Sequence, residues 1–330
     1  MSAIDPNFVV ARTMQYSLSV QHELPYGVLL ETAYVGNLGR HEVRQPDINV
    51  PSFAQAIADV GDTTNQMRPL LGYSGITQFR SDSNSNYNAL QISGTKRKGD
   101  LVATLSYTYS KVLGQTSGIN DNPEPECAFT CQGPSGQTVS WRQFYYGPLS
   151  FDRRNIFVAT YTYSLPFFRS QKGVVGQALG GWSFSGITRA QSGQPLTVNG
   201  SAKIGTGTTA QLKLLSAFNR RASLGAGNPC TGGNLCWFDS SQYVAAPTTS
   251  IGTAPVGNIL GPGYYAWDMS LRKVFRLPRE GTNLTFQADA FNVFNRTNWQ
   301  NPGTGVGGSL GLLGSSNPPR QLQFGGRFAF

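Results

Sequence analysis

Charge is scarce in this sequence, and so are histidine, cysteine and methionine. Charged residues make up 13% of the 330 residues, with two His, four Cys and four Met. Soluble proteins carry about twice that fraction of charge. Aromatic residues are abundant, at 12%, and there are 39 Gly and 19 Pro. Because disordered chains combine high charge with few aromatics, this composition excludes a disordered protein and favours strands and turns over helices.

Long apolar runs are also absent. No stretch reaches the roughly 18 consecutive apolar residues of a transmembrane helix, so no such helix is predicted. Residues 1–12 show neither the basic region nor the long apolar region of a signal peptide, and none is predicted.

The formal net charge is +9, which suits a partner with negative charge such as nucleic acid, anionic lipid or lipopolysaccharide. The densest basic cluster is KRKGD at residues 96–100, and it is interpreted as a solvated turn. No helix-turn-helix, zinc-finger or RNA-recognition pattern occurs. Nucleic acid is therefore not expected as a partner.

Apolar and polar residues alternate with a period of two along much of the chain. In LVATLSYTYSK, for example, Leu101, Leu105 and Tyr109 share one face while Thr and Ser occupy the other. Nine such segments, each about ten residues long, are predicted as strands. They are residues 12–24, 28–37, 87–97, 101–111, 155–165, 181–190, 266–277, 283–291 and 321–330.

The connections between these strands alternate between short and long. The short ones are residues 25–27, 98–100, 278–281 and, somewhat longer, 166–180, whereas the long ones are about 38–86, 113–154, 191–265 and 295–319. Antiparallel strands place every second connection at the same end, and outer-membrane barrels have short periplasmic turns and long extracellular loops. We therefore predict an all-β, antiparallel transmembrane β-barrel in a Gram-negative outer membrane, with outer-membrane lipid and lipopolysaccharide as partners. A secreted soluble β-domain, such as a sandwich, also alternates and is the alternative.

In a barrel the apolar rows face lipid and the polar rows face the lumen. Leu105, Leu271 and Phe286 are therefore predicted to be lipid-facing, and Tyr and Trp near strand ends fit an interfacial girdle. The residues predicted to face the lumen are Asp268, Arg272, Arg276, Gln287, Asp289 and Arg327.

Nine strands place the two termini on opposite sides, but bacterial single-chain barrels have an even number of strands and two periplasmic ends. We therefore expect residues 1–330 to be one carboxyl-terminal fragment, about 9–10 strands, of a larger barrel. An uncounted tenth strand, YSGITQF at residues 73–79, is the alternative. The sheet would either leave its first and last strands as open edges or close as a smaller barrel.

The ending QFGGRFAF resembles the carboxyl-terminal signal by which outer-membrane proteins are handed to the barrel-assembly machinery. Gln323, Gly325, Phe328 and Phe330 occupy the positions of that signal. Gly325 and Gly326 lack side chains, so we expect the last strand to bend there.

Longer segments resemble the barrel of Oar-like TonB-dependent receptors across residues 10–330. They include SLSVQHELPYGVLLETAYVGNLGRH, NYNALQISGTKRKGDLVATLSYTYSK, FDRRNIFVATYTYSLPF, GGWSFSGITRAQSGQPLTV and ADAFNVFNRTNW. The resemblance implies a 22-stranded barrel with an amino-terminal plug, often preceded by a carboxypeptidase-regulatory-like domain. Neither the plug nor that domain is visible in this sequence. The implied function is uptake of an unknown solute, with the TonB complex acting only through the missing plug. A non-transporting adhesin or structural barrel that presents long extracellular loops is the alternative.

The four cysteines form two close pairs in predicted extracellular loops, which are an oxidising environment. We predict a disulfide within each pair, with free thiols and a metal site as alternatives. Zinc would need further ligands, and neither His22 nor His41 neighbours a cysteine, so no metal or other cofactor is predicted. The pairs are Cys127 with Cys131 and Cys230 with Cys236.

Two short patterns are reminiscent of enzymes. GGSLG at residues 307–311 has the spelling of a nucleophile elbow, and GTGVGG at residues 303–308 has that of a dinucleotide fingerprint. Both need a strand before them and a helix after them, and a Gly-rich loop surrounds them here. No catalytic residue is therefore predicted.

Two further motifs, FDRRN at residues 151–155 and FNRTNW at residues 294–299, lie where long loops meet strands. They would either contact a ligand at the mouth of the barrel or form rim turns, with an ion pair from Asp152 to Arg153 or Arg154. The rim interpretation is favoured.

Overall fold

The fold was analysed in a computed structural model. The structure describes residues 1–49, 58–59, 61–117, 131–132, 138–201, 209–211, 213–214, 223–229, 235–244, 254–278 and 281–330. Within these ranges, none of the helices has the length and apolar character needed to cross a membrane.

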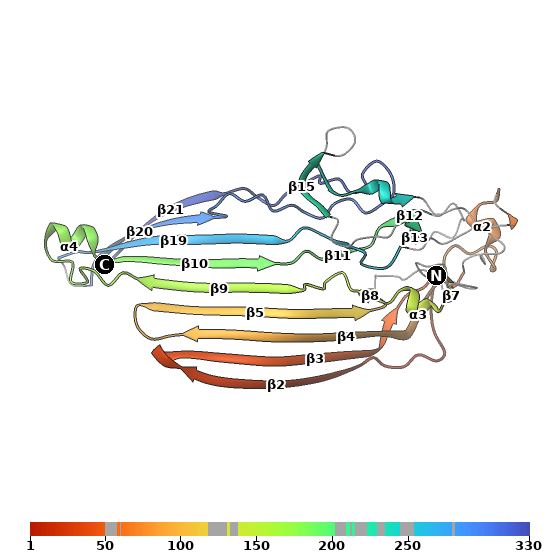
Figure 1. Ribbon diagram of the computed structural model, residues 1–330, viewed down its shortest axis with the longest axis horizontal. Coiled ribbons are helices and arrows are strands. Elements are labelled where there is room, and N and C mark those ends of the chain that lie inside the picture. Colours follow the sequence, from red (N-terminus) through yellow and green to blue (C-terminus); the bar gives the residue numbers. More distant parts are fainter. Residues whose placement is uncertain are drawn as a thin grey trace.

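One antiparallel sheet dominates the molecule (Figure 1). Its long strands follow one another in chain order, and each pairs with the next. They are β2 (Arg12–Leu24), β3 (Val28–Arg44), β4 (Thr77–Lys96), β5 (Leu101–Gly114), β9 (Asn155–Ser164), β10 (Trp182–Gln191), β19 (Tyr264–Arg276), β20 (Asn283–Phe291) and β21 (Gln321–Ala329).

Shorter elements lie mostly in the connections. The strands are β1 (Ser2–Ile4), β6 (Cys131–Gln132), β7 (Thr138–Val139), β8 (Gly147–Pro148), β11 (Pro195–Leu196), β12 (Asn199–Ser201), β13 (Thr209–Gln211), β14 (Lys213–Leu214), β15 (Ser223–Pro229), β16 (Leu235–Phe238), β17 (Tyr243–Val244) and β18 (Ile259–Leu260). The helices are η1 (Pro25–Gly27), α2 (Thr64–Met67), α3 (Trp141–Phe144), α4 (Gly173–Leu179) and η2 (Ser240–Gln242).

The all-β antiparallel fold and the nine predicted strands are confirmed, but two of the strands are much longer than expected. β3 has 17 residues and β4 has 20, whereas a tilted strand needs only about 9–11 residues to cross a membrane. The amino-terminal half of β4, TQFRSDSNSN, is polar on both faces and therefore lacks the alternation that reveals a strand. It is ordered by pairing with β3 and by buried Arg44, whose Nε and Nη2 donate to the Asp82 carboxylate at 2.6 and 2.8 Å.

The proposed tenth strand at residues 73–79 is wrong. Its last three residues are the beginning of β4, where they also pair in parallel with β1. The segment therefore adds no further antiparallel crossing to the sheet.

The sheet is open. β2 and β21 end the order of paired strands, and they do not pair with each other. This excludes the smaller closed barrel among the described residues and leaves two free edges. The described chain ends lie at opposite ends of the strands, and the short turns gather at the end marked C in Figure 1.

The two faces of the sheet differ as the alternation predicts. Leu271 lies opposite Phe184 and Ala288, and large apolar side chains on this face are exposed, with Leu18 at 72% and Phe324 at 75%. On the other face Ser270 lies opposite Ser185 and Asp289. Large apolar side chains on an exposed face of this extent match a lipid-facing wall.

Three aromatic side chains on the apolar face cover the glycines directly opposite them. The pairs are Tyr16 with Gly36, Tyr161 with Gly186 and Phe286 with Gly326. A Cβ atom added to Gly36 would lie 2.1 Å from the Tyr16 ring, and one added to Gly326 would lie 3.9 Å from the Phe286 ring. An aromatic ring that lies across a glycine restores packing in a strand.

This pairing explains the glycines near the end of the chain. β21 keeps an unbroken register with β20 through Gly325 and Gly326. No bulge interrupts this pairing, and Gly326 leaves room for the Phe286 ring. The expected bend at these glycines stays a prediction.

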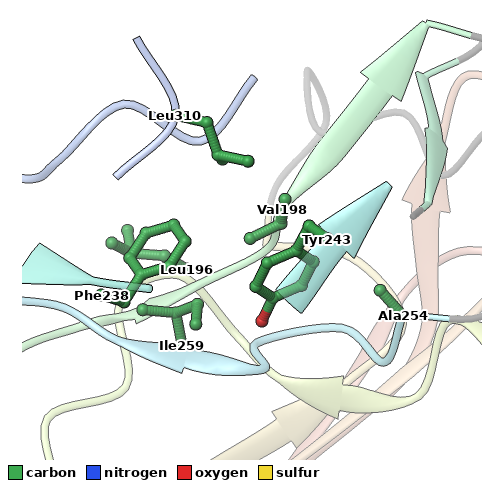
Figure 2. Close-up of a cluster of buried hydrophobic side chains, with 7 residues drawn as sticks. All are labelled: Leu196, Val198, Phe238, Tyr243, Ala254, Ile259 and Leu310. Atoms are coloured by element: carbon green, nitrogen blue, oxygen red, sulfur yellow. The ribbon is translucent and has the colours of Figure 1, made fainter. Parts of the chain in front are cut away.

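A buried apolar cluster lies in the long connections rather than in the wall (Figure 2). Its side chains come from the β10–β19 and β20–β21 connections, and Trp237 packs against them. The short pairs β11–β18 and β15–β16 lie within the β10–β19 connection, and a bridge between Cys236 and Leu312 joins it to the β20–β21 connection. The cluster consists of Leu196, Val198, Phe238, Tyr243, Ala254, Ile259 and Leu310.

The base of this loop cluster depends on a close backbone approach. The N–H of Gly261 donates to the Gln194 carbonyl at 2.8 Å. A Cβ atom added to Gly193 would lie 1.7 Å from the Gly261 carbonyl oxygen, a distance that real atoms never adopt. Glycine is required at residue 193 because two backbone segments meet there.

The face assignment predicts the effect of a charge on the apolar row. Leu271→Arg should destabilise the protein in bilayers by about 2–4 kcal/mol, because the guanidinium would sit in hydrocarbon. The measurement is urea-induced unfolding in lipid vesicles, with Leu271→Ala and the opposite-face Ser270→Arg as controls. Equal stability of Leu271→Arg and Leu271→Ala would show that the faces are reversed.

The close approach at Gly193 predicts a local effect. Gly193→Ala should loosen the loop cluster at a cost of about 1–3 kcal/mol or more, since the added methyl group overlaps a carbonyl oxygen. Limited proteolysis of the folded protein should then show faster cleavage between β10 and β19. Gly314→Ala is the matched control, because nothing lies within 4 Å of its added Cβ atom. Equal cleavage of the two variants would contradict the prediction.

Candidate functional site

The polar face of the wall carries a groove of about 550 Å³. β5, β9, β10, β19 and β20 contribute to it. Its polar side chains are mostly hydroxyls and carboxylates, namely Thr104, Thr160, Thr162, Ser185, Asp268, Ser270 and Asp289. Strand register places these side chains together, since Thr104 lies opposite Thr160, Thr162 lies opposite Ser185, and Ser270 lies opposite both Ser185 and Asp289. The apolar side chains of Val102, Ile187 and Phe291 also line the groove.

Two carboxylates organise this wall groove. Asp268 accepts a hydrogen bond from Arg189 Nη2 at 2.8 Å and another from the main-chain N–H of Asn292 at 2.9 Å. Asp289 accepts from Gln287 Nε2 at 2.9 and 3.1 Å. The groove therefore offers oriented carboxylates and hydroxyl groups, which can bind a hydrogen-bonding solute.

The residues predicted to face the lumen share this face. Arg272 lies opposite Gln287, Arg276 lies opposite Asn283, and Arg327 lies opposite Thr285. Arg272, Arg276 and Arg327 lie towards the short-turn end of the strands, whereas Asp268 and Asp289 belong to the wall groove. That this face borders a lumen stays a prediction.

A second groove, of about 490 Å³, lies at the mouth where the long loops meet the strands. Its lining is rich in amides and includes two aromatic side chains. The lining residues are Arg153, Gln191, Gln194, Pro262, Gly263, Tyr264, Trp299, Gln300, Asn301 and Asn317.

Arg153, from the FDRRN motif, is the cation of this mouth groove. Its guanidinium donates to Gln194 Oε1 at 2.6 Å and to the main-chain carbonyls of Asp152 and Ser150 at 2.9 and 3.1 Å. Burial lowers the pKa of Arg153, and the nearby charge of Asp152 opposes that effect. The side chain is thus held in place by neutral acceptors, while its positive charge contributes to the groove.

The predicted rim ion pair from Asp152 to Arg153 or Arg154 is wrong, because the Asp152 carboxylate has a different partner. The Asp152 carboxylate is buried and accepts from the main-chain N–H of Val112 at 2.9 Å. Arg153 reaches the Asp152 carbonyl instead, and the Arg154 guanidinium lies 5.9 Å from the centre of the Tyr109 ring. The motif therefore ties the β5 and β9 strands together through a hydrogen bond to the backbone.

The FNRTNW motif forms the rim turn that the sequence favoured. Asn292 and Asn295 adopt left-handed φ angles of 49° and 51°. The Asn292 side chain bonds both the N–H and the carbonyl of Arg296, and buried Asn298 bonds both main-chain polar groups of Tyr265. Asparagine suits such positions because its amide mimics a peptide group.

Sequence reasoning did not single out Asn292 or Asn298. The available signal was the repeated spacing of three residues in NVFNRTN. It separates polar turn residues from a strand but does not reveal their partners, which are Arg296 for the Asn292 side chain and Tyr265 on β19 for Asn298.

One cysteine of the predicted disulfides can be described. Cys236 is buried and disulfide-bonded. Cys127 and Cys230 lie outside the described residues, and the Cys131 side chain is likewise not described although its backbone belongs to β6. The pairing therefore stays a prediction.

The enzyme-like patterns lack the flanking elements that they need. Residues 301–311 form turns and isolated bridges rather than a strand followed by a helix. Within the part of the chain that the structure describes, no group of three or more His, Cys, Asp and Glu side chains could hold a metal ion.

The residues of the predicted assembly signal lie on β21 and just beyond it. Gln323 lies opposite Asp289, Gly325 opposite Gln287, and Phe328 opposite Leu284. Phe328 stacks on Phe330 with ring centres 5.8 Å apart, and Phe330 is 97% exposed. Their role in assembly stays a prediction.

The chain resembles solved outer-membrane proteins. It is 12% identical to the outer membrane transporter YddB of Escherichia coli, with a TM-score of 0.53, and the match covers 98% of this chain and 33% of the transporter. A second match is the ferric-catecholate import receptor Fiu of Escherichia coli, with 12% identity and a TM-score of 0.45, covering 99% of this chain and 29% of the receptor. A third is the pyoverdine outer membrane receptor FpvA of Pseudomonas aeruginosa, with 12% identity and a TM-score of 0.44, covering 97% of this chain and 30% of the receptor.

The likeness to YddB shows a shared fold, and this chain spans 33% of the length of that transporter. A search of curated proteins finds no match. Residues 1–323 match the sequence profile of the outer membrane beta barrel domain. The protein is thus located in the outer membrane, and the chain belongs to the outer membrane beta-barrel domain family.

Proposed function

We propose that this protein takes part in TonB-dependent solute uptake, as the carboxyl-terminal part of the barrel of an Oar-like receptor. The open sheet supports this proposal, because β2 and β21 leave unpaired backbone groups that a larger barrel would pair. The coverage of 33% of YddB agrees with such a fragment. In the complete receptor, a plug would connect the barrel to the TonB complex.

The observation that carries the proposal is a polar route, a chain of contacts between polar side chains that joins the mouth groove to the wall groove. Tyr264 lines the mouth groove, and its ring centre lies 5.6 Å from the Arg189 guanidinium. Arg189 in turn binds Asp268, which lines the wall groove. A solute captured at the mouth would therefore meet polar side chains along the wall of the barrel.

The lining indicates the chemistry of the solute. The mouth groove combines a guanidinium, several carboxamides and the aromatic faces of Tyr264 and Trp299. These groups recognise a polar compound with acceptor oxygens and a flat or apolar face. An adhesin or structural barrel would not need polar grooves joined in this way, so that alternative has less support.

The proposal predicts that uptake depends on Arg153. The solute would be sought as a compound whose uptake is lost both when the gene for this protein is deleted and when TonB is removed. Arg153→Gln should raise the half-saturating solute concentration about tenfold, because a charge-assisted hydrogen bond is lost. The control is Arg97→Gln, in an exposed turn at the other end of the strands. The two variants are compared at equal amounts of protein in the outer membrane. If the deletion strain takes up every tested compound normally but loses surface attachment, the adhesin function would replace this one.

The end of the chain should direct assembly. Deleting residues 327–330 from the receptor should abolish its insertion into the outer membrane while synthesis and export continue, because the barrel-assembly machinery would lose Phe328 and Phe330. Membrane fractionation and heat-modifiable gel mobility would measure insertion. Deletion of four residues from the exposed turn at 305–308 is the matched control. Normal outer-membrane levels after the terminal deletion would leave Phe330 an ordinary strand end.

A further inference from the structure

The β9–β10 connection, residues 166–180, differs from the other turns at its end of the sheet. It contains α4 and lies beyond the ends of the strands, close to the end of the chain (Figure 1). The β2–β3 turn is only three residues long. We call residues 166–180 the turn segment.

A buried lysine on the apolar row holds the turn segment. Lys273 is 3% exposed, and its Nζ donates to the carbonyls of Gln177 at 2.6 Å and Ala178 at 3.2 Å, and also to that of Gly180. The same ammonium lies 5.3 Å from the centre of the Trp182 ring. A cation at the carboxyl end of a helix binds its unpaired carbonyls, so these carbonyl dipoles stabilise the charge of Lys273 within the wall.

Gln171 fixes the other side of the turn segment. Its side-chain amide donates to the Val274 carbonyl at 2.9 Å, and its Oε1 accepts from the main-chain N–H of Arg276 at 3.0 Å. In this way a single side chain extends the pairing of β19 beyond the end of β10. The turn segment is therefore docked rigidly on the strand that carries the apolar row.

This docked segment presents large apolar side chains to the outside. Val174 is 87% exposed, and four further apolar side chains are at least half exposed. Phe168 also has a left-handed φ of 48°, a conformation that costs free energy for an aromatic residue. These exposed side chains are Phe167, Phe168, Val174, Val175 and Leu179.

Two observations indicate which surroundings these exposed apolar side chains meet. The apolar patch continues into the lipid-facing row, since Trp182 and Phe275 both approach Lys273 beneath α4. Two basic side chains belong to the same segment, namely exposed Arg169, which also binds Asp100, and exposed Lys172 at the start of α4. Apolar side chains flanked by Lys and Arg are typical of segments that lie in the headgroup region of a membrane.

We propose that the turn segment is an interfacial anchor in the periplasmic leaflet of the outer membrane. Its apolar side chains insert at the boundary between headgroups and acyl chains, and Arg169 and Lys172 bind the phosphates of anionic phospholipid. The inference rests on the outer-membrane location and not on the proposed uptake. A protein partner is less well supported, because the patch adjoins a surface that already faces lipid.

The test measures tryptophan fluorescence of the full chain reconstituted in lipid vesicles, with a tryptophan introduced into the turn segment. Val174→Trp emission should be quenched by phospholipid brominated near the headgroup end of its acyl chains, and more weakly by phospholipid brominated near the chain end. Leu71→Trp, at another exposed apolar position in the loop between β3 and β4, is the control and should not be quenched. The unsubstituted protein gives the signal of the five native tryptophans.

The binding of phosphates by Arg169 and Lys172 is tested with a separate variant. Vesicles containing phosphatidylglycerol should increase the quenching of Val174→Trp relative to phosphatidylcholine alone. The added changes Arg169→Gln and Lys172→Gln should abolish that increase while heat-modifiable mobility stays normal.

Equal quenching of Val174→Trp and Leu71→Trp would overturn the proposal, because the segment would then face water. It would also be overturned if Val174→Trp responded only to added barrel-assembly complex and not to lipid. That result would identify a protein partner. Neither readout depends on solute uptake, so failure here is distinguishable from failure of the proposed function.

Discussion

Backbone hydrogen bonding in hydrocarbon is the constraint on which this structure depends. Lipid offers no partner for an N–H or carbonyl group, so each membrane-crossing strand must pair with a neighbour on both sides. The antiparallel sheet from β2 to β21 meets this requirement everywhere except at its two edges. Pairing also sets the side-chain pattern, because one face then meets lipid and the other meets polar surroundings. The glycines covered by Tyr16, Tyr161 and Phe286 belong to the same pattern, since they let rings lie flat on the lipid-facing side.

A wall of this kind has no interior of its own, and the apolar cluster of the chain therefore forms in the loops. Leu196, Phe238 and Leu310 come from connections far apart in sequence and pack at the mouth. The Gly193–Gly261 contact and the asparagine turns around Asn292 and Asn298 then connect this cluster to the strand ends. Burial raises the pKa of Tyr243 within the cluster, where its hydroxyl accepts from buried Asn258. The mouth groove owes its shape to this rigid support.

The two ends of the wall use charge differently. At the mouth, Arg153 and Arg189 point their guanidinium groups at Gln194 and Asp268 along the polar route. At the short-turn end, Lys273 lies on the apolar row and donates hydrogen bonds to the carbonyls at the end of α4. Arg153 and Lys273 each donate to several acceptor oxygens, whereas exposed Arg189 pairs with the Asp268 carboxylate. The consequence is a polar surface where a solute would bind and an apolar surface where lipid would lie.

Period-two alternation and loop length determined the nine strands, their order, their two faces and the outer-membrane class, because both signals are local and the membrane enforces them residue by residue. The polar half of β4 escaped detection since a strand outside the membrane needs no apolar face. Only the tertiary structure decided which residues meet across strands: Arg153 with Gln194, Arg189 with Asp268, and Lys273 with the end of α4. These contacts join residues 41, 79 and 96 positions apart, and a repeating pattern within one segment carries no information about a partner at such a distance. The sequence alone therefore determined the wall, whereas packing between connections and strands decided the grooves and the anchor.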